Sequence, residues 1–356
     1  MAQALRLAEL GLFTTQPNPR VGCVIAHGDE VVGAGWHRRA GEPHAEVFAL
    51  REAGERARGA TAYVTLEPCA HHGRTPPCAD ALIAAGVARV VIAGDDPFPQ
   101  VNGCGIDKLR AAGITVETGL MREPARELNI GFFSRIERGR PWLRVKLAMS
   151  LDGRTALANG ESKWITGEAA RADVQRWRAR SSAILTGSGT VLADDPRLTV
   201  RLPVQSSFAP PLRVVLDRRL RTPTGSHVLD GEAATLVLHA QDAVAADDRF
   251  AGVEHLALPL HGEGLDLRAV LAQLAVRDCN EVHVEAGPTL CGALFAAGLV
   301  DELLLYVAPV LLGDAARPLL HLPNITAMSA RWQLETIDRC AMGDDTRLLL
   351  RPRAPV

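Results

Sequence analysis

The sequence predicts a layered α/β protein with two domains. Stretches with helical spacing of apolar residues alternate with short apolar stretches along the chain, and several of the helical stretches end at a glycine. The chain has 356 residues, which is too long for one ordinary hydrophobic core. No segment repeats at a fixed period, so the two halves are expected to be different domains. We place them at residues 1–139 and 140–356.

The first half is expected to start with a helix, continue through a β-hairpin and then alternate helices with strands. Pro17 and Pro19 exclude regular structure between the first helix and the hairpin. Gly86 and Gly113 each follow a helical stretch and are suited to its C-terminus. The predicted helices span residues 2–10, 44–58, 78–85, 106–112 and 123–129, and the predicted strands span 21–25, 31–36, 61–66, 88–93 and 114–118.

The second half shows the same alternation with different spacing. Thr166 is a good N-cap for a helix over residues 168–180, and Glu168 suits the first turn of that helix. Two further helices are expected at 267–276 and 289–297. The predicted strands span residues 143–149, 183–186, 213–216, 235–239, 281–285, 303–307 and 347–351.

Composition excludes several classes of function. Hydrophobic residues make up 47% of the chain and charged residues 22%, and 39 basic against 41 acidic residues leave a formal charge of −2. A nucleic-acid-binding surface normally needs a basic excess. No stretch approaches the roughly 20 apolar residues of a membrane span, and no signal segment precedes the first helix. We therefore expect a cytoplasmic protein with reduced thiols and no nucleic-acid or membrane partner.

Three residues have the types and spacing of a catalytic zinc site. His44 and Glu46 lie on the first turn of the helix predicted over 44–58, Cys69 follows a strand and Cys78 opens another helix. Three protein ligands leave the fourth tetrahedral position open for a water whose pKa the metal lowers to about 7. Glu46 is not needed as a ligand and is placed to carry protons between that water, a ring nitrogen and a departing amine. The pattern H-x-E followed by P-C and a second Cys is typical of zinc-dependent base deaminases.

The cysteine ligands are expected near helix N-termini, where the helix dipole favours thiolate. The other cysteines share no metal-binding spacing, and we interpret them as packing residues: Cys23, Cys104, Cys279, Cys291 and Cys340.

Three segments of the first half resemble the deaminase half of the bifunctional riboflavin-biosynthesis proteins. They are PNPRVGCVI at 17–25, PHAE at 43–46 and EPCAHHGRTPPC at 67–78. Eight residues separate Cys69 from Cys78, whereas the common deaminase pattern is C-x-x-C. The resemblance implies a cytidine-deaminase-like, three-layer N-terminal domain. It also implies contacts to the pyrimidine and its ribose phosphate at Asn18, His37, His71 and Arg74. His71 could instead be a fourth zinc ligand or stabilise its loop, and we interpret His72 as structural.

Two glycine-rich turns in the second half could bring backbone N–H groups to phosphates. They are TGSGT at 186–190 and EAGPTL at 285–290, each directly after a predicted strand. Glycine-rich segments of this kind are as often tight turns that bind no ligand. Neither matches the G-x-G-x-x-G fingerprint that opens a helix, so a Rossmann dinucleotide fold is not predicted.

Four longer segments resemble the reductase half of the same family, which has a dihydrofolate-reductase-like fold and uses NADPH. They are VKLAMSLDGRTA at 145–156, GESKWITG at 160–167, SSAILTGSGTVLADDPRLTVR at 181–201 and VEAGPTL at 284–290. The resemblance implies NADPH contacts at Ala148, Trp164, Thr190, Asp194 and along the turn 287–293, including Gly287 and Thr289. It implies substrate contacts at Ser162, Arg178, Leu198, Arg201 and Glu285. Arginines suit that role because they can pair bidentately with a phosphate. Lys146 and Asp152 are further polar candidates without an assigned role.

Three positions depart from the family pattern. Ala286 replaces a glycine, and the turn would be slightly altered if that position needed a positive φ. Phe98 replaces a polar residue and Cys104 a basic one. These departures leave a substrate contact at Phe98 in doubt.

The resemblance implies an enzyme of riboflavin biosynthesis with one Zn²⁺ per chain and NADPH. It would deaminate 2,5-diamino-6-(5-phosphoribosylamino)pyrimidin-4-one and then reduce the ribosyl chain, giving 5-amino-6-(5-phosphoribitylamino)uracil. We expect a homo-oligomer, either a dimer or a tetramer. One alternative is a deaminase of another base with a non-catalytic nucleotide-binding second domain. A non-enzymatic alternative makes the zinc structural and the second half a nucleotide sensor.

Overall fold

The computed structural model describes residues 1–70, 77–99, 101–203 and 206–353. The chain divides into two compact units, which are described separately. Unit 1 comprises Met1–Gly139 and Ser207–Ala209. Unit 2 comprises Arg140–Ser206 and Pro210–Val356.

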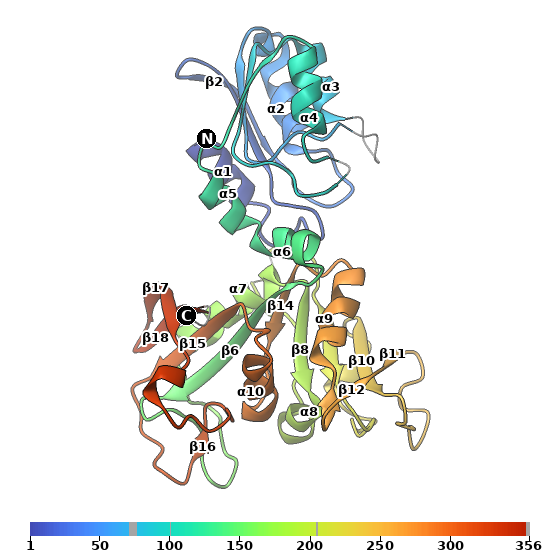
Figure 1. Cartoon of the computed structure of the whole chain (residues 1–356), viewed down its shortest axis with the longest axis vertical. Coiled ribbons are helices and arrows are strands. Elements are labelled where there is room, and N and C mark those ends of the chain that lie inside the picture. Colours follow the sequence, from blue (N-terminus) through green and yellow to red (C-terminus); the bar gives the residue numbers. More distant parts are fainter. Residues whose placement is uncertain (71–76, 100, 204–205, 354–356) are drawn as a thin grey trace. The chain divides into compact units, whose positions relative to one another are not determined.

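Unit 1 is built on a five-stranded mixed sheet with the strand order β2-β1-β3-β4-β5 (Figure 1). The strands β2, β1 and β3 are antiparallel neighbours, whereas β3, β4 and β5 run parallel. The carboxyl ends of β3 and β4 therefore meet at one edge of the sheet, where ligands bind in open α/β sheets. The strands span Gly22–His27 (β1), Glu30–Trp36 (β2), Thr61–Val64 (β3), Arg89–Ile92 (β4) and Thr115–Thr118 (β5).

Helices cover both faces of this sheet. Inward-facing residues of the strands, such as Ile25 and Val64, pack with α2, α3 and α4 in the main core. The other face receives α1, against which Gly22 packs so closely that an added Cβ would lie 1.9 Å from the carbonyl oxygen of Ala4. The helices are α1 (Ala2–Glu9), α2 (Ala45–Ala53), α3 (Cys78–Ala85), α4 (Cys104–Ala111), α5 (Arg122–Leu128) and α6 (Ile130–Arg138). The layered α/β prediction is confirmed for this half.

Two helix predictions in unit 1 differ from the structure. The helix expected over 44–58 ends at Ala53, because Gly54 adopts a positive φ of 55° and a short 3₁₀ turn over Gly54–Ala57 follows. His44 is the N-cap of α2 and does not lie in its first turn. Sequence reasoning also missed α6, whose Phe132 and Phe133 bury their rings against Leu66.

Unit 2 is built on a nine-stranded sheet with the order β11-β10-β9-β8-β14-β6-β15-β18-β17. Neighbours from β11 through to β15 run parallel, and β18 and β17 complete the sheet with antiparallel pairing. The main strands span Trp142–Ser150 (β6), Ala183–Gly187 (β8), Leu212–Leu216 (β9), Thr235–Ala240 (β10), Glu254–Leu258 (β11), Glu281–Val284 (β14), Glu302–Ala308 (β15), Leu334–Met342 (β17) and Asp345–Pro352 (β18). Two small ribbons pair β7 (Arg154–Ala156) with β16 (Arg317–Pro318) and β12 (Leu260–His261) with β13 (Gly264–Leu265).

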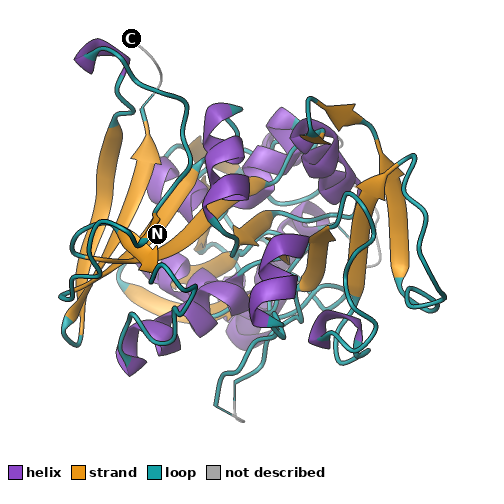
Figure 2. Ribbon diagram, turned by 90° about the horizontal axis from the view of Figure 1, so that it is seen from below, coloured by secondary structure: helices purple, strands orange, loops and turns teal. Residues whose placement is uncertain are grey.

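Alternate residues of the unit 2 strands pack against helices on opposite faces of the sheet. On β15, Leu303 and Leu305 belong to the core that includes α9 and α10, whereas Leu304 and Tyr306 pack against α7. Figure 2 shows helices on both sides of the strands. The helices are α7 (Glu168–Arg180), α8 (Ser188–Asp194), α9 (Leu267–Val276) and α10 (Pro288–Ala296).

The predicted N-cap of α7 is wrong. The cap is Gly167, whose N–H donates to Asp345 Oδ2 at 2.7 Å, and no side chain caps the helix. The strand β17 was also missed, because its residues are mostly exposed and lack a clear alternation.

The cysteine prediction holds only in part. None of the seven cysteines forms a disulfide, and Cys23, Cys279 and Cys291 are buried. Cys340 is half-buried, and Cys104 is exposed and is therefore not a packing residue. Across the described ranges, no helix is both long and apolar enough to cross a membrane.

Candidate active sites

In unit 1, His44, Cys69 and Cys78 lie together although they are distant in sequence. Their ligand atoms all lie within 4.8 Å of one another. His44 Nδ1 is 3.2 Å from Cys78 Sγ and 3.7 Å from Cys69 Sγ. This is the only group of this kind in the described part of the chain, and no fourth His, Cys, Asp or Glu joins it there.

Local packing places each of these residues. His44 occupies the N-cap position of α2. This helix lies directly on β2 because Gly33 and Gly35 have no side chains. A Cβ added at Gly33 would lie 2.2 Å from the Ala49 carbonyl oxygen, and one added at Gly35 would lie 2.6 Å from that of Ala45. Cys78 is the first residue of α3. Cys69 follows β3 rather than opening a helix, but its Sγ accepts the Cys78 backbone N–H at 3.4 Å. Both sulfurs therefore lie at the positive end of α3, where thiolate is favoured.

Glu46 lies in the first turn of α2, two residues after His44. Its side chain is only 3% exposed, and its Oε2 has no hydrogen-bond partner among the described residues. Burial raises the pKa of the Glu46 carboxyl, and the negative charge of Cys69 adds to the rise. A buried carboxylate oxygen without a partner is costly unless something binds there.

The electrostatics of the cluster favour one thiolate already without a metal. The hydrogen bond from the Cys78 thiol lowers the pKa of Cys69 to about 4. That same hydrogen bond, together with burial, raises the pKa of Cys78. The hydrogen bond to Cys69 raises the pKa of His44.

This donor set fits zinc. Two cysteine sulfurs and one imidazole nitrogen are ligands that zinc prefers, and three of them leave one tetrahedral position for water or substrate. The orphaned Oε2 of Glu46 supplies the polar group that such a water would need.

The predicted substrate contacts in unit 1 are placed only in part. Asn18 Nδ2 lies 3.0 Å from His37 Nε2, and His37 Nδ1 lies 3.1 Å from the Pro43 carbonyl oxygen. The His37 ring packs edge-on against His44, with ring centroids 5.4 Å apart. His71 and Arg74, like His72, lie outside the described residues.

Sequence reasoning did not select Asp96, which follows β4 at the same sheet edge as Cys69. Its carboxyl is buried, and burial together with the charges of Glu67 and Cys69 raises its pKa to about 6. Asp96 could have been identified from its position directly after a strand that runs parallel to β3.

Unit 2 contains a cleft of about 1510 Å³ at the carboxyl ends of its parallel strands. Every residue that was named individually as an NADPH or substrate contact in the second half lines this cleft, whereas Cys291 and Gly292 of the turn 287–293 do not. These residues are Ala148, Ser162, Trp164, Arg178, Thr190, Asp194, Leu198, Arg201, Glu285, Gly287 and Thr289.

The glycine turns leave space for a phosphate-bearing cofactor. The turn after β8 leads into α8 and the turn after β14 leads into α10. A Cβ added at Gly189 or Gly287 would meet nothing within 4 Å. Bare backbone at such positions suits the close approach of a nucleotide cofactor. Ala286 keeps an ordinary negative φ, so its replacement of glycine does not strain the turn.

A buried ion pair stands at the base of the cleft. Arg178 donates bidentately to Glu285, with Nε–Oε1 and Nη2–Oε2 distances of 2.6 and 2.8 Å, and its Nη1 donates to the Thr199 carbonyl at 2.9 Å. Burial alone would raise the pKa of Glu285, but Arg178 outweighs it and holds that pKa well below its usual range. Burial lowers the pKa of the nearby Lys146, which also lines the cleft.

Asp152 does not line the cleft. Its carboxylate accepts from the Ser150 hydroxyl and from the backbone N–H groups of Leu312 and Gly313, and the Ser150 hydrogen bond lowers its pKa to about 2. Asp152 therefore braces a loop.

Several cleft residues were missed by the sequence analysis. Arg218 follows β9, so its place after a parallel strand could have revealed it. His321, whose Nδ1 is 3.2 Å from Thr289 Oγ1, comes from a distant segment and carries no sequence signal.

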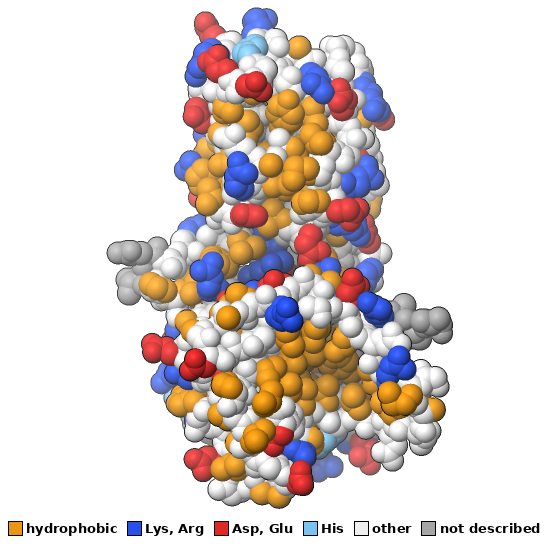
Figure 3. All heavy atoms as spheres, turned by 90° about the vertical axis from the view of Figure 1, so that its left-hand side faces the viewer, with side chains coloured by type: hydrophobic (Ala, Val, Ile, Leu, Met, Phe, Trp, Pro, Cys, Tyr) orange, Lys and Arg blue, Asp and Glu red, His pale blue; other side chains and the backbone are white. Residues whose placement is uncertain are grey.

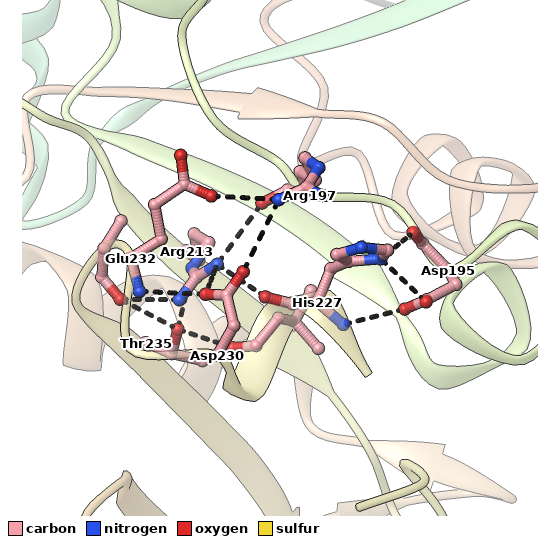
Figure 4. A network of polar contacts seen from close by, with 9 residues as sticks. Asp195, Arg197, Arg213, His227, Asp230, Glu232 and Thr235 are labelled. Carbon is pink, nitrogen blue, oxygen red and sulfur yellow. Dashed lines mark hydrogen bonds and ion pairs between the residues drawn. The ribbon is translucent and has the colours of Figure 1, made fainter. Parts of the chain in front are cut away.

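A polar network around the buried Arg213 supports the side of the cleft formed by residues 195–198 (Figure 4). Arg213 is fully buried and donates to Asp230 Oδ1 at 2.9 Å and to the His227 carbonyl at 2.8 Å. The His227 backbone N–H in turn donates to Asp195 Oδ1 at 2.8 Å. These contacts stabilise a turn in which Asp195 and Leu198 both have positive φ.

Two family models together match most of the chain. Residues 1–94 match the cytidine and deoxycytidylate deaminase zinc-binding region. Residues 141–345 match the RibD C-terminal domain.

Relatives and solved structures match both halves at once. The chain is 52% identical to riboflavin biosynthesis protein RibD of Escherichia coli, over 98% of each chain. It is 42% identical to RibD of Bacillus amyloliquefaciens, over 99% of this chain and 95% of that protein.

Among structures, Acinetobacter baumannii RibD superimposes with a TM-score of 0.92 at 46% identity, covering 99% of this chain and 98% of the other. A Thermotoga maritima protein described as a diaminohydroxyphosphoribosylaminopyrimidine deaminase and 5-amino-6-(5-phosphoribosylamino)uracil reductase gives a TM-score of 0.88 at 32% identity, covering 99% and 97%. The fold, the deaminase motif and these full-length matches lead to one conclusion: the chain belongs to the RibD family of riboflavin biosynthesis proteins.

Proposed function

We propose that the chain performs its two reactions at two separate sites, the deamination in unit 1 and the reduction in unit 2. As a member of the RibD family, the chain is a bifunctional deaminase and reductase of riboflavin biosynthesis. The proposed substrate is 2,5-diamino-6-(5-phosphoribosylamino)pyrimidin-4-one and the proposed product is 5-amino-6-(5-phosphoribitylamino)uracil. The observation that carries the proposal is the cluster of His44, Cys69 and Cys78 beside the orphaned carboxylate of Glu46.

In unit 1, His44, Cys69 and Cys78 would hold one zinc ion. Zinc, when bound, would lower the pKa of a coordinated water and thereby supply a nucleophile at neutral pH. Glu46 would accept one proton from the attacking water and pass it to the ring nitrogen, and would then accept the second proton of that water and pass it to the leaving amine. Its burial favours this role, because a raised pKa makes a carboxylate a better proton acceptor. Asn18, which lies against His37, would hydrogen-bond to the edge of the pyrimidine ring.

In unit 2, the cleft would hold NADPH on the turns at Gly189 and Gly287 and the phosphoribosyl substrate at Ser162, Arg178, Leu198, Arg201 and Glu285. NADPH, when bound, would supply a hydride to C1′ of the ring-opened sugar. Arg201 would bind the substrate phosphate. Glu285 is held in place by Arg178 and can accept from substrate hydroxyl groups. We assign residues 1–139 to the deaminase domain and residues 140–356 to the reductase domain.

The alternative of another base deaminase with a non-catalytic second domain is not favoured. The RibD reductase model matches residues 141–345, and full-length relatives carry both halves. The same matches disfavour the non-enzymatic alternative.

We also propose that the chain assembles into a homo-oligomer and works in the cytoplasm. The strand β17 is an edge strand of the unit 2 sheet, and apolar side chains gather on the face that carries β17 and β18 (Figure 3). Ile337 of β17 and Trp332, which precedes this strand in the sequence, are each 40% exposed. Such an edge is a candidate for pairing with a second copy. The absence of disulfides among seven cysteines supports a reducing compartment.

The direct test measures ammonia release and NADPH oxidation on one purified sample supplied with the diaminopyrimidinone. We expect one ammonia and then one NADPH oxidised for each substrate molecule. Ammonia release without NADPH oxidation would instead support the alternative with a non-catalytic second domain.

A further inference from the structure

One buried carboxylate in unit 1 serves neither as a zinc ligand nor as a proton carrier in the proposed reaction. Glu67 lies two residues before Cys69 and is only 4% exposed. Four backbone N–H groups converge on its two oxygens. Oε1 accepts from Gly105 at 2.9 Å and Ile106 at 3.2 Å, and Oε2 accepts from Gly103 at 3.0 Å and Asp96 at 3.4 Å.

These donors identify Glu67 as the cap of a helix from which it is remote in sequence. Gly103 is the N-cap of α4 and has no side chain with which to cap the helix itself. The N–H groups of the first turn of a helix have no partner within the helix, and a carboxylate at that end is stabilised by the helix dipole. Glu67 supplies this partner from the segment that follows β3.

The fit between the two segments is also tight at the backbone. A Cβ at Gly105 would lie 1.9 Å from the Pro68 carbonyl oxygen, so only glycine allows α4 to approach this closely. The Glu67 backbone N–H donates to the Gly94 carbonyl at 3.0 Å, which ties the same residue to the segment after β4.

Cys69, the residue after Pro68, is one of the proposed zinc ligands. The Cys69 carbonyl accepts the Ala79 N–H at 3.1 Å, and Cys69 Sγ accepts the Cys78 N–H at 3.4 Å. Glu67 fixes one end of the Glu67–Cys69 segment against α4, and α3 fixes the other. The sulfur of Cys69 can therefore shift little relative to Cys78 and His44.

We propose that Glu67 is a positioning residue that sets the place of Cys69 in the zinc site by clamping the segment after β3 to the start of α4. This inference rests on the proposed zinc site. Outer-shell groups that orient zinc ligands typically contribute about 10- to 100-fold in metal affinity or activity, and we expect Glu67 to act within that range.

The test compares the zinc affinity of the full chain with that of two variants, by competition with a chromophoric chelator. Glu67→Gln puts an NH₂ group against backbone donors, and Gly105→Ala pushes α4 away from Pro68 while Glu67 is intact. We expect both variants to bind zinc at least about 10-fold more weakly than the wild type. With saturating zinc, we expect deaminase kcat to remain reduced. NADPH-dependent reductase activity should be unchanged and reports that unit 2 is folded, whereas the thermal unfolding of each variant reports the state of unit 1.

The matched control is Glu52→Gln. Glu52 is an exposed carboxylate in the same unit that accepts a single backbone N–H, from Ala34 at 3.0 Å. Its substitution should leave zinc affinity and both activities unchanged.

The outcomes separate the clamp from general stability and from the zinc site itself. The positioning role would be overturned if Glu67→Gln had the same zinc affinity and the same zinc-saturated kcat as the wild type. This holds even if the Tm of the variant is lower. If Glu67→Gln leaves unit 1 unfolded, the Glu67→Asp variant is measured in its place. This variant keeps the charge with a shorter reach, and wild-type zinc affinity in its folded form would equally overturn the proposal. A wild-type chain that binds no zinc would instead refute the proposed site.

Discussion

The two candidate sites differ in how many residues carry them. In unit 1, three ligand atoms within 4.8 Å of one another and one buried carboxylate form the proposed reactive centre among the described residues. In unit 2, a cleft of about 1510 Å³ is lined by residues from many separate segments, among them the ion pair between Arg178 and Glu285. A metal site concentrates its chemistry in a few side chains, whereas a cofactor cleft spreads binding over many contacts.

This difference predicts how each site responds to damage. Loss of one ligand or one carboxylate should abolish the unit 1 reaction, because no further His, Cys, Asp or Glu of the described residues joins the cluster. Loss of one contact in unit 2 should lower the affinity for NADPH or the substrate only by the free energy that this contact contributes. The predictions below test this contrast, beginning with the largest effect.

Removal of the metal should produce the largest effect. A chelator, or the substitution Cys69→Ser, should abolish ammonia release while NADPH oxidation with the deaminated substrate continues. Added zinc should restore the chelated wild type. Cys104→Ser is the matched control, because Cys104 is an exposed cysteine of the same unit outside the cluster. Loss of the reductase activity on chelation would contradict the contrast.

Removal of one partner of the buried ion pair should be the next largest effect. Arg178→Met leaves the half-buried Glu285 without its cation and should destabilise unit 2 by up to about 3 kcal/mol. Urea unfolding followed by tryptophan fluorescence measures this change. Arg197→Met, which removes an exposed pair with Glu232, should change stability little. An equal effect of the two substitutions would show that the Arg178–Glu285 pair is not the anchor of the cleft.

Removal of one phosphate contact should produce the smallest effect. Arg201→Ala should raise the reductase KM about 10- to 100-fold and leave kcat nearly unchanged, because a hydrogen bond to a charged group contributes about 1.5–3 kcal/mol. Arg219→Ala removes an exposed arginine that does not line the cleft and should leave the KM unchanged. A collapse of kcat in Arg201→Ala would place this residue in the chemical step and not only in binding.

The sequence predicts the two sites unequally for a physical reason. The zinc ligands belong to short motifs because tetrahedral geometry demands defined residue types, so His44, Cys69, Cys78 and Glu46 could be selected from their pattern. The unit 2 residues became candidates only through resemblance, since a glycine turn or a single arginine has many other uses.

Features that depend on tertiary packing could not be predicted in this way. Glu67 caps α4 across 36 to 39 residues of sequence, and no local pattern marks such a contact. Thr166 looked like an N-cap, but Asp345 from the far end of the chain binds the N–H of Gly167 instead. Helix α2 ended early because Gly54 takes a positive φ, although the apolar spacing continues beyond it.

The central claim is that Glu46 moves protons for one reaction only and that the second site works independently. Glu46→Gln keeps the size of the side chain and removes its basicity, so the deaminase kcat should fall by about 10²- to 10⁴-fold. Ammonia release and NADPH oxidation should both be measured on the same sample of this variant, with the diaminopyrimidinone and with the deaminated intermediate. We predict that ammonia release is lost and that NADPH oxidation with the intermediate is unchanged. Retained ammonia release, or loss of both activities in a folded protein, would contradict the account.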